Sequence, residues 1–409
     1  MSNAPSAPQP APRPAARLAQ VQQPVIPLMG ELIAQHPGTL SLGQGMVHWP
    51  PPHQALALLQ RGFGGHDALQ TYGPMAGDPP LREALETWLR SNHKLDLSES
   101  ALLVTAGSNM AFNAVTQVLC DPGDELILPV PYYFNHAMAI QLAGGRPVAV
   151  EAGVIPDPER LAAAITPRTR AIVTVSPNNP SGAVIPPHTL AAINELCASR
   201  GLLHLCDEAY ALFGHGSTPI WSPGSRPGSG RHTVSFGSLS KSHGMAGWRL
   251  GWAVVPRGLM AALAKVQDTI LICPPRPIQQ AALGALEAGA DWVHERVAGL
   301  SERRRRVLAA LQPRPSAAHA KSQDGLPWRV LGPADGAFYA LLQLNAPVSS
   351  DRAMKQLIRE YGVALVSGSS FGLPQGCLRL SYGLLSDHDL GTALERLHSG
   401  LERICSSNT

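Results

Sequence analysis

The sequence is poor in cysteine, in aromatic residues and in charge of either sign. Its 409 residues include six cysteines, 5% aromatic and 15% charged residues, with a formal net charge of +3. The scattered cysteines form no CxxC pair, so neither a zinc knuckle nor a disulfide framework is indicated, and a reducing cytoplasm fits best. So small a net charge gives no broad electrostatic field for nucleic acid or an acidic membrane surface. We therefore expect no metal site and no nucleic-acid partner.

Long hydrophobic runs are also lacking. No stretch approaches the roughly 18 apolar residues needed to span a bilayer, and the N-terminus lacks the apolar segment of a signal peptide. We therefore expect a soluble, cytoplasmic protein without membrane contact. The one dense basic run, Arg303 to Arg306, lies in a helical pattern and is interpreted as a solvated helix face.

Apolar residues make up 44% of the chain, and its length favours two or three compact units. Between Thr71 and Ala288, helical patterns such as Pro80–Arg90 alternate with short apolar runs that predict strands. Those runs are 125–130, 171–175 and 202–206. Such alternation is typical of an α/β domain with a mostly parallel sheet.

Two segments have the composition of unstructured chain. Residues 1–24 are dominated by Ala, Pro, Gln and Ser, and predict a disordered tail. Ser301–Leu311 reads as a helix, and the loop Pro313–Pro327 that follows it is rich in Pro, Ser and Ala. A second, smaller unit is expected to begin there.

Three short segments carry the chemistry. In the segment 238–251, Lys241 lies among small residues with an arginine eight positions later. Asp207 ends an apolar run and opens Asp-Glu-Ala-Tyr, and the segment 177–182, Pro-Asn-Asn-Pro-Ser-Gly, follows another apolar run. Ligands of open α/β sheets bind at the carboxyl ends of strands. Taken singly, the segments would read as a surface lysine, a helix N-terminus and a turn.

Together and in this order, the three segments resemble the aminotransferase family of fold-type I pyridoxal-phosphate (PLP) enzymes, classes I and II. The resemblance runs from about Ser41 to Tyr382. Leu42-Gly-Gln-Gly45 followed by Trp49-Pro-Pro-Pro52 is similar to the branch that holds the aspartate, aromatic and kynurenine/glutamine transaminases.

The resemblance implies an aspartate aminotransferase-like α/β fold. A large PLP-binding domain, with a mostly parallel seven-stranded sheet flanked by helices, is expected over residues 55–295. A smaller α/β domain is expected from the N-terminal segment 25–54 and the C-terminal third, 296–409.

The resemblance also implies the catalytic residues. Lys241 would form the Schiff base with PLP and act as general base once released. Asp207 would pair with the protonated pyridine nitrogen and keep the ring an electron sink. Asn179 and Tyr210 would donate hydrogen bonds to the phenolic oxygen of the ring, and Tyr133 would stack on its face.

For the cofactor's phosphate, a glycine turn that opens a helix supplies N–H groups and a favourable dipole. The resemblance assigns Gly107, Ser108 and Asn109 to this turn, and Ser238 and Arg249 to the remainder of the phosphate cup.

The same resemblance assigns the substrate and the dimer. Arg379 would bind the substrate's α-carboxylate as a planar, bidentate partner, together with Asn179. Gly45 would approach the same carboxylate with its backbone, because it lacks a Cβ. Tyr72 would reach the phosphate site of a second subunit, which implies a homodimer.

The expected activity is transfer of an α-amino group from an amino acid to a 2-oxo acid by a ping-pong mechanism. Alternatives on the same fold are a PLP-dependent C–S β-lyase, a cyclase or side-chain-modifying enzyme, and a non-catalytic PLP-binding protein. The last is disfavoured because Lys241, Asp207 and Arg379 are all in place, and because only a proline-rich tail is expected where such regulators carry a DNA-binding module.

The identity of the substrate stays open. His48, Trp49 and Met245 are candidates for its side-chain pocket, although core packing is the more frequent fate of Trp and Met.

Overall fold

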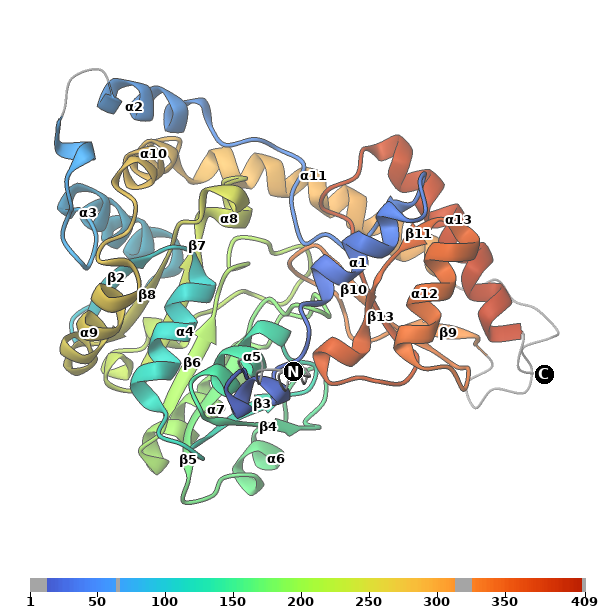
Figure 1. Cartoon of the computed structure of the whole chain (residues 1–409), viewed down its shortest axis with the longest axis horizontal. Helices are drawn as coiled ribbons and strands as arrows, with labels where there is room; N and C mark the ends of the chain where they lie inside the picture. Colours follow the sequence, from blue (N-terminus) through green and yellow to red (C-terminus); the bar gives the residue numbers. More distant parts are fainter. Residues whose placement is uncertain (1–12, 64–66, 313–325, 407–409) are drawn as a thin grey trace, which may run out of the picture.

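The computed structural model describes residues 13–63, 67–312 and 326–406. Its larger sheet has seven strands in the order β2-β8-β7-β6-β5-β3-β4 (Figure 1). Neighbouring strands are parallel except at β8, which runs antiparallel to both β2 and β7. The predicted mostly parallel seven-stranded sheet is confirmed. Its strands are β2 (Ser100–Thr105), β3 (Glu125–Pro129), β4 (Arg146–Val150), β5 (Thr169–Val175), β6 (Leu203–Asp207), β7 (Thr233–Ser238) and β8 (Gly251–Pro256).

Helices cover both faces of this sheet, which is why its central strands are apolar on both sides. Leu126 and Leu128 pack with one set of helices, and Ile127, which points the other way, packs with another. The first set comprises α4 (Ser108–Leu119), α5 (Phe134–Leu142) and α9 (Met260–Leu271). The opposite face carries α3 (Pro79–Trp88), α6 (Pro158–Ala163), α7 (Pro187–Arg200) and α10 (Arg276–Glu287).

A smaller unit is built from both ends of the chain. Its four-stranded antiparallel sheet has the order β12-β13-β10-β9. Leu40 of the N-terminal segment pairs in parallel with Val363 near the C-terminus, and Figure 1 shows α1 beside the C-terminal helices. The strands are β1 (Leu40–Ser41), β9 (Trp328–Val330), β10 (Tyr339–Leu344), β11 (Val363–Ala364), β12 (Val366–Ser367) and β13 (Cys377–Ser381).

The helix α11 connects the two units in Figure 1. The remaining α-helices of the described chain, with α11 among them, are α1 (Val25–Ala34), α2 (His53–Phe63), α8 (Leu239–Ser242), α11 (Gly289–Ala310), α12 (Ser350–Tyr361) and α13 (Asp387–Ser406).

The interpretation of the basic run as a solvated face is wrong for its first two residues. Arg303 is buried, with an ion pair to Asp387 at 3.0 Å and a bond to the Tyr382 carbonyl at 3.2 Å. Arg304 pairs with Asp335 at 2.9 Å. Successive helical residues are rotated by about 100°, so four consecutive residues cover every face of a helix and cannot all meet solvent.

Parts of the predicted tail and loop, residues 1–12 and 313–325, lie outside the described residues. The short 3₁₀ helix Ala16–Gln20 has no buried residue. Among the described helices, none is long and apolar enough to cross a membrane.

Candidate active site

A cavity of about 250 Å³ opens at the carboxyl ends of the strands of the large sheet. Val175 ends β5, Asp207 ends β6 and Ser238 ends β7, and all three line the cavity. Every residue predicted to be catalytic or to bind the cofactor or the substrate's carboxylate, except Tyr72 and Gly107, contributes to the wall. These are Gly45, Ser108, Asn109, Tyr133, Asn179, Asp207, Tyr210, Ser238, Lys241, Arg249 and Arg379.

Lys241 lies in the one-turn helix α8 that directly follows β7. Its Nζ donates a hydrogen bond to the carbonyl oxygen of Gly45. Burial, with Arg379 and Arg249 nearby, lowers the pKa of the Lys241 amine to about 8, against the smaller opposing effect of Asp207. The neutral amine is therefore accessible at only mildly alkaline pH.

The buried carboxylate of Asp207 is held from two sides. Its Oδ2 lies 3.1 Å from Nε2 of His136, and its Oδ1 accepts the Ala209 backbone N–H at 3.1 Å. The His136 ring stacks on Phe112 with centroids 4.1 Å apart. These contacts fix the direction of the carboxylate without using all its lone pairs.

A sharp turn lies at the start of α4. The 12-residue helix α4 begins at Ser108, and the preceding Gly107 has a φ of 87°. A Cβ on Gly107 would collide with the guanidinium of Arg249, so the missing side chain makes room for that cation. The first N–H groups of a helix have no partner within it, and Ser108, Asn109 and Arg249 all line the cavity.

Arg379 enters the cavity from β13 of the small sheet. Its Nη1 donates to Asn179 Oδ1 at 2.9 Å and its Nη2 to the Gly43 carbonyl at 2.5 Å. Its buried Nε has no hydrogen-bond partner among the described residues. Because Asn179 accepts through its oxygen, its amide N–H groups are left to donate elsewhere.

Three tyrosines bring further hydroxyl groups to the wall. The Tyr133 hydroxyl lies 2.8 Å from Asn135 Nδ2, from which it accepts. The Tyr210 hydroxyl lies 2.7 Å from that of Tyr339. Burial raises the pKa of the Tyr339 hydroxyl to about 12 and raises that of Tyr210 as well, so both remain neutral donors at physiological pH.

Sequence reasoning missed part of the site. Tyr339 was not predicted because a tyrosine in an apolar strand usually indicates core packing. His136 was not predicted because it contacts Asp207 only in the folded chain. Ser240 could have been predicted as a site residue, because it directly precedes Lys241. The remaining unpredicted wall residues are Ile26, Gln44, Met46, Phe134, Val175 and Ala209.

The candidates for a substrate side-chain pocket lie elsewhere. Trp49 is buried, stacks on Phe213 with centroids 6.4 Å apart and donates to the Ser242 carbonyl. Met245 is also buried in the core, and His48 contacts the Gly383 carbonyl. Trp49 and Met245 therefore pack in the hydrophobic core.

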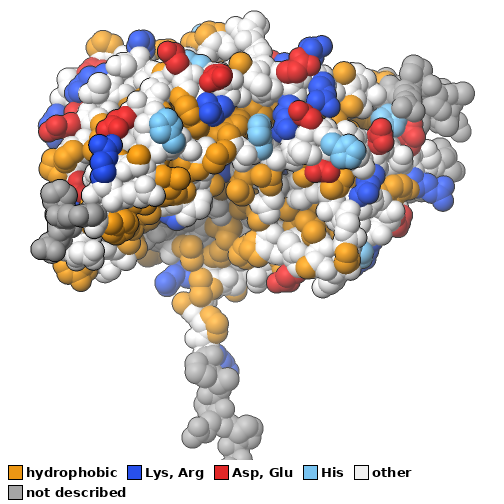
Figure 2. All heavy atoms as spheres, turned by 90° about the horizontal axis from the view of Figure 1, so that it is seen from above, with side chains coloured by type: hydrophobic (Ala, Val, Ile, Leu, Met, Phe, Trp, Pro, Cys, Tyr) orange, Lys and Arg blue, Asp and Glu red, His pale blue; other side chains and the backbone are white. Residues whose placement is uncertain are grey.

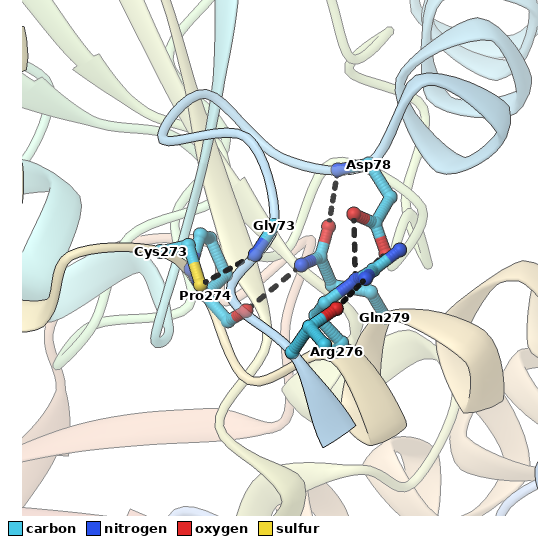
Figure 3. Close-up of polar contacts among 7 residues, drawn as sticks. Gly73, Asp78, Cys273, Pro274, Arg276 and Gln279 are labelled. Atoms are coloured by element: carbon cyan, nitrogen blue, oxygen red, sulfur yellow. Dashed lines mark hydrogen bonds and ion pairs between the residues drawn. The ribbon is translucent and has the colours of Figure 1, made fainter. Parts of the chain in front are cut away.

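Tyr72 lies outside the cavity and is 80% exposed. The loop that carries it is anchored next to the start of α10 (Figure 3). Gly73 N–H contacts Cys273 Sγ at 3.3 Å, and Asp78 pairs with Arg276 at 3.1 Å. Gln279 accepts from the Asp78 backbone at 2.6 Å and donates to the Pro274 carbonyl at 2.9 Å.

Comparison with known proteins gives a consistent result. The family described as "Aminotransferase class I and II" matches residues 38–397. The aromatic aminotransferase of Arabidopsis thaliana is 33% identical, over 95% of this chain and 96% of its own. The aspartate/prephenate aminotransferase of Thermus thermophilus is 36% identical, over 81% and 83%. The structure of Thermus thermophilus aspartate aminotransferase with maleate superposes with a TM-score of 0.84 at 31% identity, covering 95% of this chain and all of that one.

With this sheet order, cavity and similarity, the chain belongs to the class I and II aminotransferases. It has the aspartate aminotransferase-like fold, and it is a transaminase that depends on PLP. The resemblance drawn from the three sequence segments is confirmed.

The residues of the cavity fit this cofactor. PLP carries a phosphate, a ring nitrogen that takes a proton and an aldehyde. The wall offers a helix N-terminus beside Arg249, a buried carboxylate at Asp207 and an amine at Lys241. The unpartnered Nε of Arg379 is suited to an additional anion, as the substrate of a transaminase provides.

We expect the amine of Lys241 to react with acetic anhydride in the folded apoprotein with a midpoint near pH 8, because only the neutral amine is a nucleophile. In the urea-unfolded chain the midpoint should move toward the ordinary lysine value of 10.5. Competitive labelling followed by peptide mass spectrometry measures both midpoints. Equal midpoints in the two states would contradict the described environment of Lys241.

Proposed function

We propose that this aminotransferase works through Lys241, Asp207 and Arg379, in two half-reactions that share one site. The observation that carries the proposal is the convergence of an amine, a carboxylate and a guanidinium from three distant segments on one cavity. When bound, PLP supplies an aldehyde that combines with amines and a ring that withdraws electrons from the adjacent carbon.

Lys241 is proposed to hold the cofactor and to move the proton. Its lowered pKa supports an amine that is neutral often enough to bind an aldehyde. When it is free, the Nζ of Lys241 would be the base that takes the proton from the substrate's Cα. The Gly45 carbonyl, which accepts from Nζ, restricts where that amine can point.

Asp207 is proposed to accept a hydrogen bond from the protonated ring nitrogen. The contact with His136 at 3.1 Å supports this role, because it fixes the carboxylate and keeps a donor beside its negative charge. The Asn179 amide and the Tyr210 hydroxyl are proposed to donate to the ring's phenolic oxygen. Tyr133 would then cover the ring's face.

The phosphate is proposed to bind at the start of α4. Ser108, Asn109 and Ser238 supply hydroxyl, amide and backbone donors, and Arg249 supplies a permanent charge. Gly107 serves indirectly, since a Cβ there would displace the Arg249 guanidinium.

Arg379 is proposed to bind the substrate's α-carboxylate through its unpartnered Nε side. Each cationic side chain that lines the cavity, among the described residues, would then have its own ligand. Lys241 would bind the aldehyde, Arg249 the phosphate and Arg379 this carboxylate. The remaining wall includes Ile26, Met46 and Phe134. Amino acids with apolar or aromatic side chains are therefore proposed as preferred donors, as the name of the Arabidopsis relative suggests.

The active form is proposed to be a homodimer in which Tyr72 reaches the phosphate site of the second subunit. An 80% exposed tyrosine on an anchored loop supports this role. Ile272 directly precedes Cys273, which anchors this loop, and its side chain is exposed. It has a φ of 65°, which is a strained conformation for a β-branched residue. Figure 2 shows hydrophobic side chains gathered across the middle of one face, around a hollow.

A cytoplasmic location is proposed as well, supported by six cysteines that are all free thiols.

The proposed chemistry predicts that the wild-type enzyme transfers the amino group of phenylalanine to 2-oxoglutarate. Aspartate should be a poorer donor, with kcat/KM lower by about tenfold or more, because its second carboxylate would lack a cation. Lys241→Ala should reduce the rate by on the order of 1000-fold or more, whereas the exposed-lysine control Lys265→Ala should match the wild type. A Lys241→Ala enzyme that retained its rate would refute the assignment.

The dimer proposal predicts complementation between two damaged chains. Tyr72→Ala should weaken PLP retention, and Lys241→Ala should be inactive. A doubly tagged hybrid of the two has one intact site if Tyr72 acts across the interface, and should recover about half the wild-type activity at limiting PLP. If the hybrid is no more active than the Tyr72→Ala dimer, Tyr72 does not act in the second subunit.

A further inference from the structure

Tyr339 is the first residue of β10 and has only 1% of its surface exposed. The segment before it is unusual, because Ala334 and Ala337 both adopt positive φ, at 47° and 54°. Non-glycine residues rarely take this conformation unless the surrounding structure enforces it. Gly182 lies next to Tyr339 and has no room for a Cβ, because the Tyr339 carbonyl oxygen fills that space. The position of Tyr339 is thus strongly determined.

The hydroxyl of Tyr339 occupies a defined place in the cavity wall. It lies 2.7 Å from the Tyr210 hydroxyl, and 2.5 Å from where a Cβ on Gly45 would be. The absence of a side chain at Gly45 therefore leaves space for this hydroxyl, in addition to any approach of a substrate carboxylate. A residue other than glycine would push the hydroxyl away from Tyr210.

The ring of Tyr339 has a second contact. The guanidinium carbon of Arg379 lies 4.8 Å from its centroid, and the Phe371 ring lies 5.3 Å from the same atom. Contact of a buried guanidinium with an aromatic face is attractive. Two rings thus contact the cation while its Nη atoms are bonded to Asn179 and Gly43.

We propose that Tyr339 is a positioning residue that holds both the Tyr210 hydroxyl and the Arg379 guanidinium in their working orientations. The inference rests on the proposed function, which assigns Tyr210 to the cofactor and Arg379 to the substrate. If Tyr210 donates its proton to the ring oxygen, the proton between the two tyrosines must come from Tyr339. The hydroxyl of Tyr339 then donates to the Tyr210 oxygen, and each bond strengthens the next.

The two contacts can be separated by substitution. Tyr339→Phe removes the hydroxyl and keeps the ring, and Tyr339→Leu removes both. The matched control is Tyr382→Phe, because Tyr382 is equally buried in the same core cluster and its hydroxyl has no hydrogen-bond partner among the described residues.

The first measurement is the Kd of pyridoxamine phosphate for the apoprotein, by equilibrium dialysis, which requires no turnover. Tyr339→Phe should raise this Kd by about threefold to tenfold, the effect of one neutral hydrogen bond, while leaving the KM for phenylalanine within about twofold of the wild type. Tyr339→Leu should raise that KM further. Tyr382→Phe should change neither, and thermal unfolding of each variant checks that it is folded.

A double-mutant cycle supplies the decisive comparison. If Tyr339 acts through Tyr210, then Tyr210→Phe combined with Tyr339→Phe should bind pyridoxamine phosphate no more weakly than Tyr210→Phe alone. Additive losses, or a Tyr339→Phe protein that matches the Tyr382→Phe control in Kd and KM, would overturn the inference. A wild-type protein that neither binds pyridoxamine phosphate nor transaminates would instead overturn the proposed function.

Discussion

The site depends on burying one lysine amine next to two guanidinium groups. Desolvation by burial is the main effect that disfavours the charged form of Lys241, and Arg379 and Arg249 disfavour it further, so its pKa falls to about 8. Among the residues that line the cavity, three cationic side chains face a single carboxylate, which leaves an excess of positive charge. Such an arrangement calls for anionic ligands, and a phosphorylated cofactor together with an amino acid's carboxylate provides them.

The fold creates this concentration of charge by joining two sheets at one cavity. The parallel strands β5, β6 and β7 bring Asn179, Asp207 and Lys241 to one edge, since each of these residues ends or follows a strand. The antiparallel sheet adds Tyr339 and Arg379, which lie on the paired strands β10 and β13. Arg379 bonds to Asn179 across this boundary at 2.9 Å. The position of the Arg379 guanidinium is therefore coupled to the arrangement of the two units.

Much of this could be predicted from the sequence, for physical reasons. An apolar run that ends in Asp207 identifies a buried strand with a carboxylate at its carboxyl end. The role of Lys241, in contrast, comes from the resemblance of its segment, 238–251, to the family. Tyr339 could not be found, because its partner Tyr210 is 129 residues away and an isolated aromatic indicates only burial. The Arg303 ion pair with Asp387 was missed for a similar reason, since helical periodicity does not reveal what packs against each face.

Whether Lys241 is the residue that carries the cofactor can be decided by one labelling measurement. The purified enzyme, loaded with PLP, is reduced with borohydride, digested and mapped by mass spectrometry. We predict a stable phosphopyridoxyl group on the peptide that contains Lys241 and on no other. A label on Lys94, Lys265 or another lysine, or no label at all, would contradict the proposed role of the buried amine.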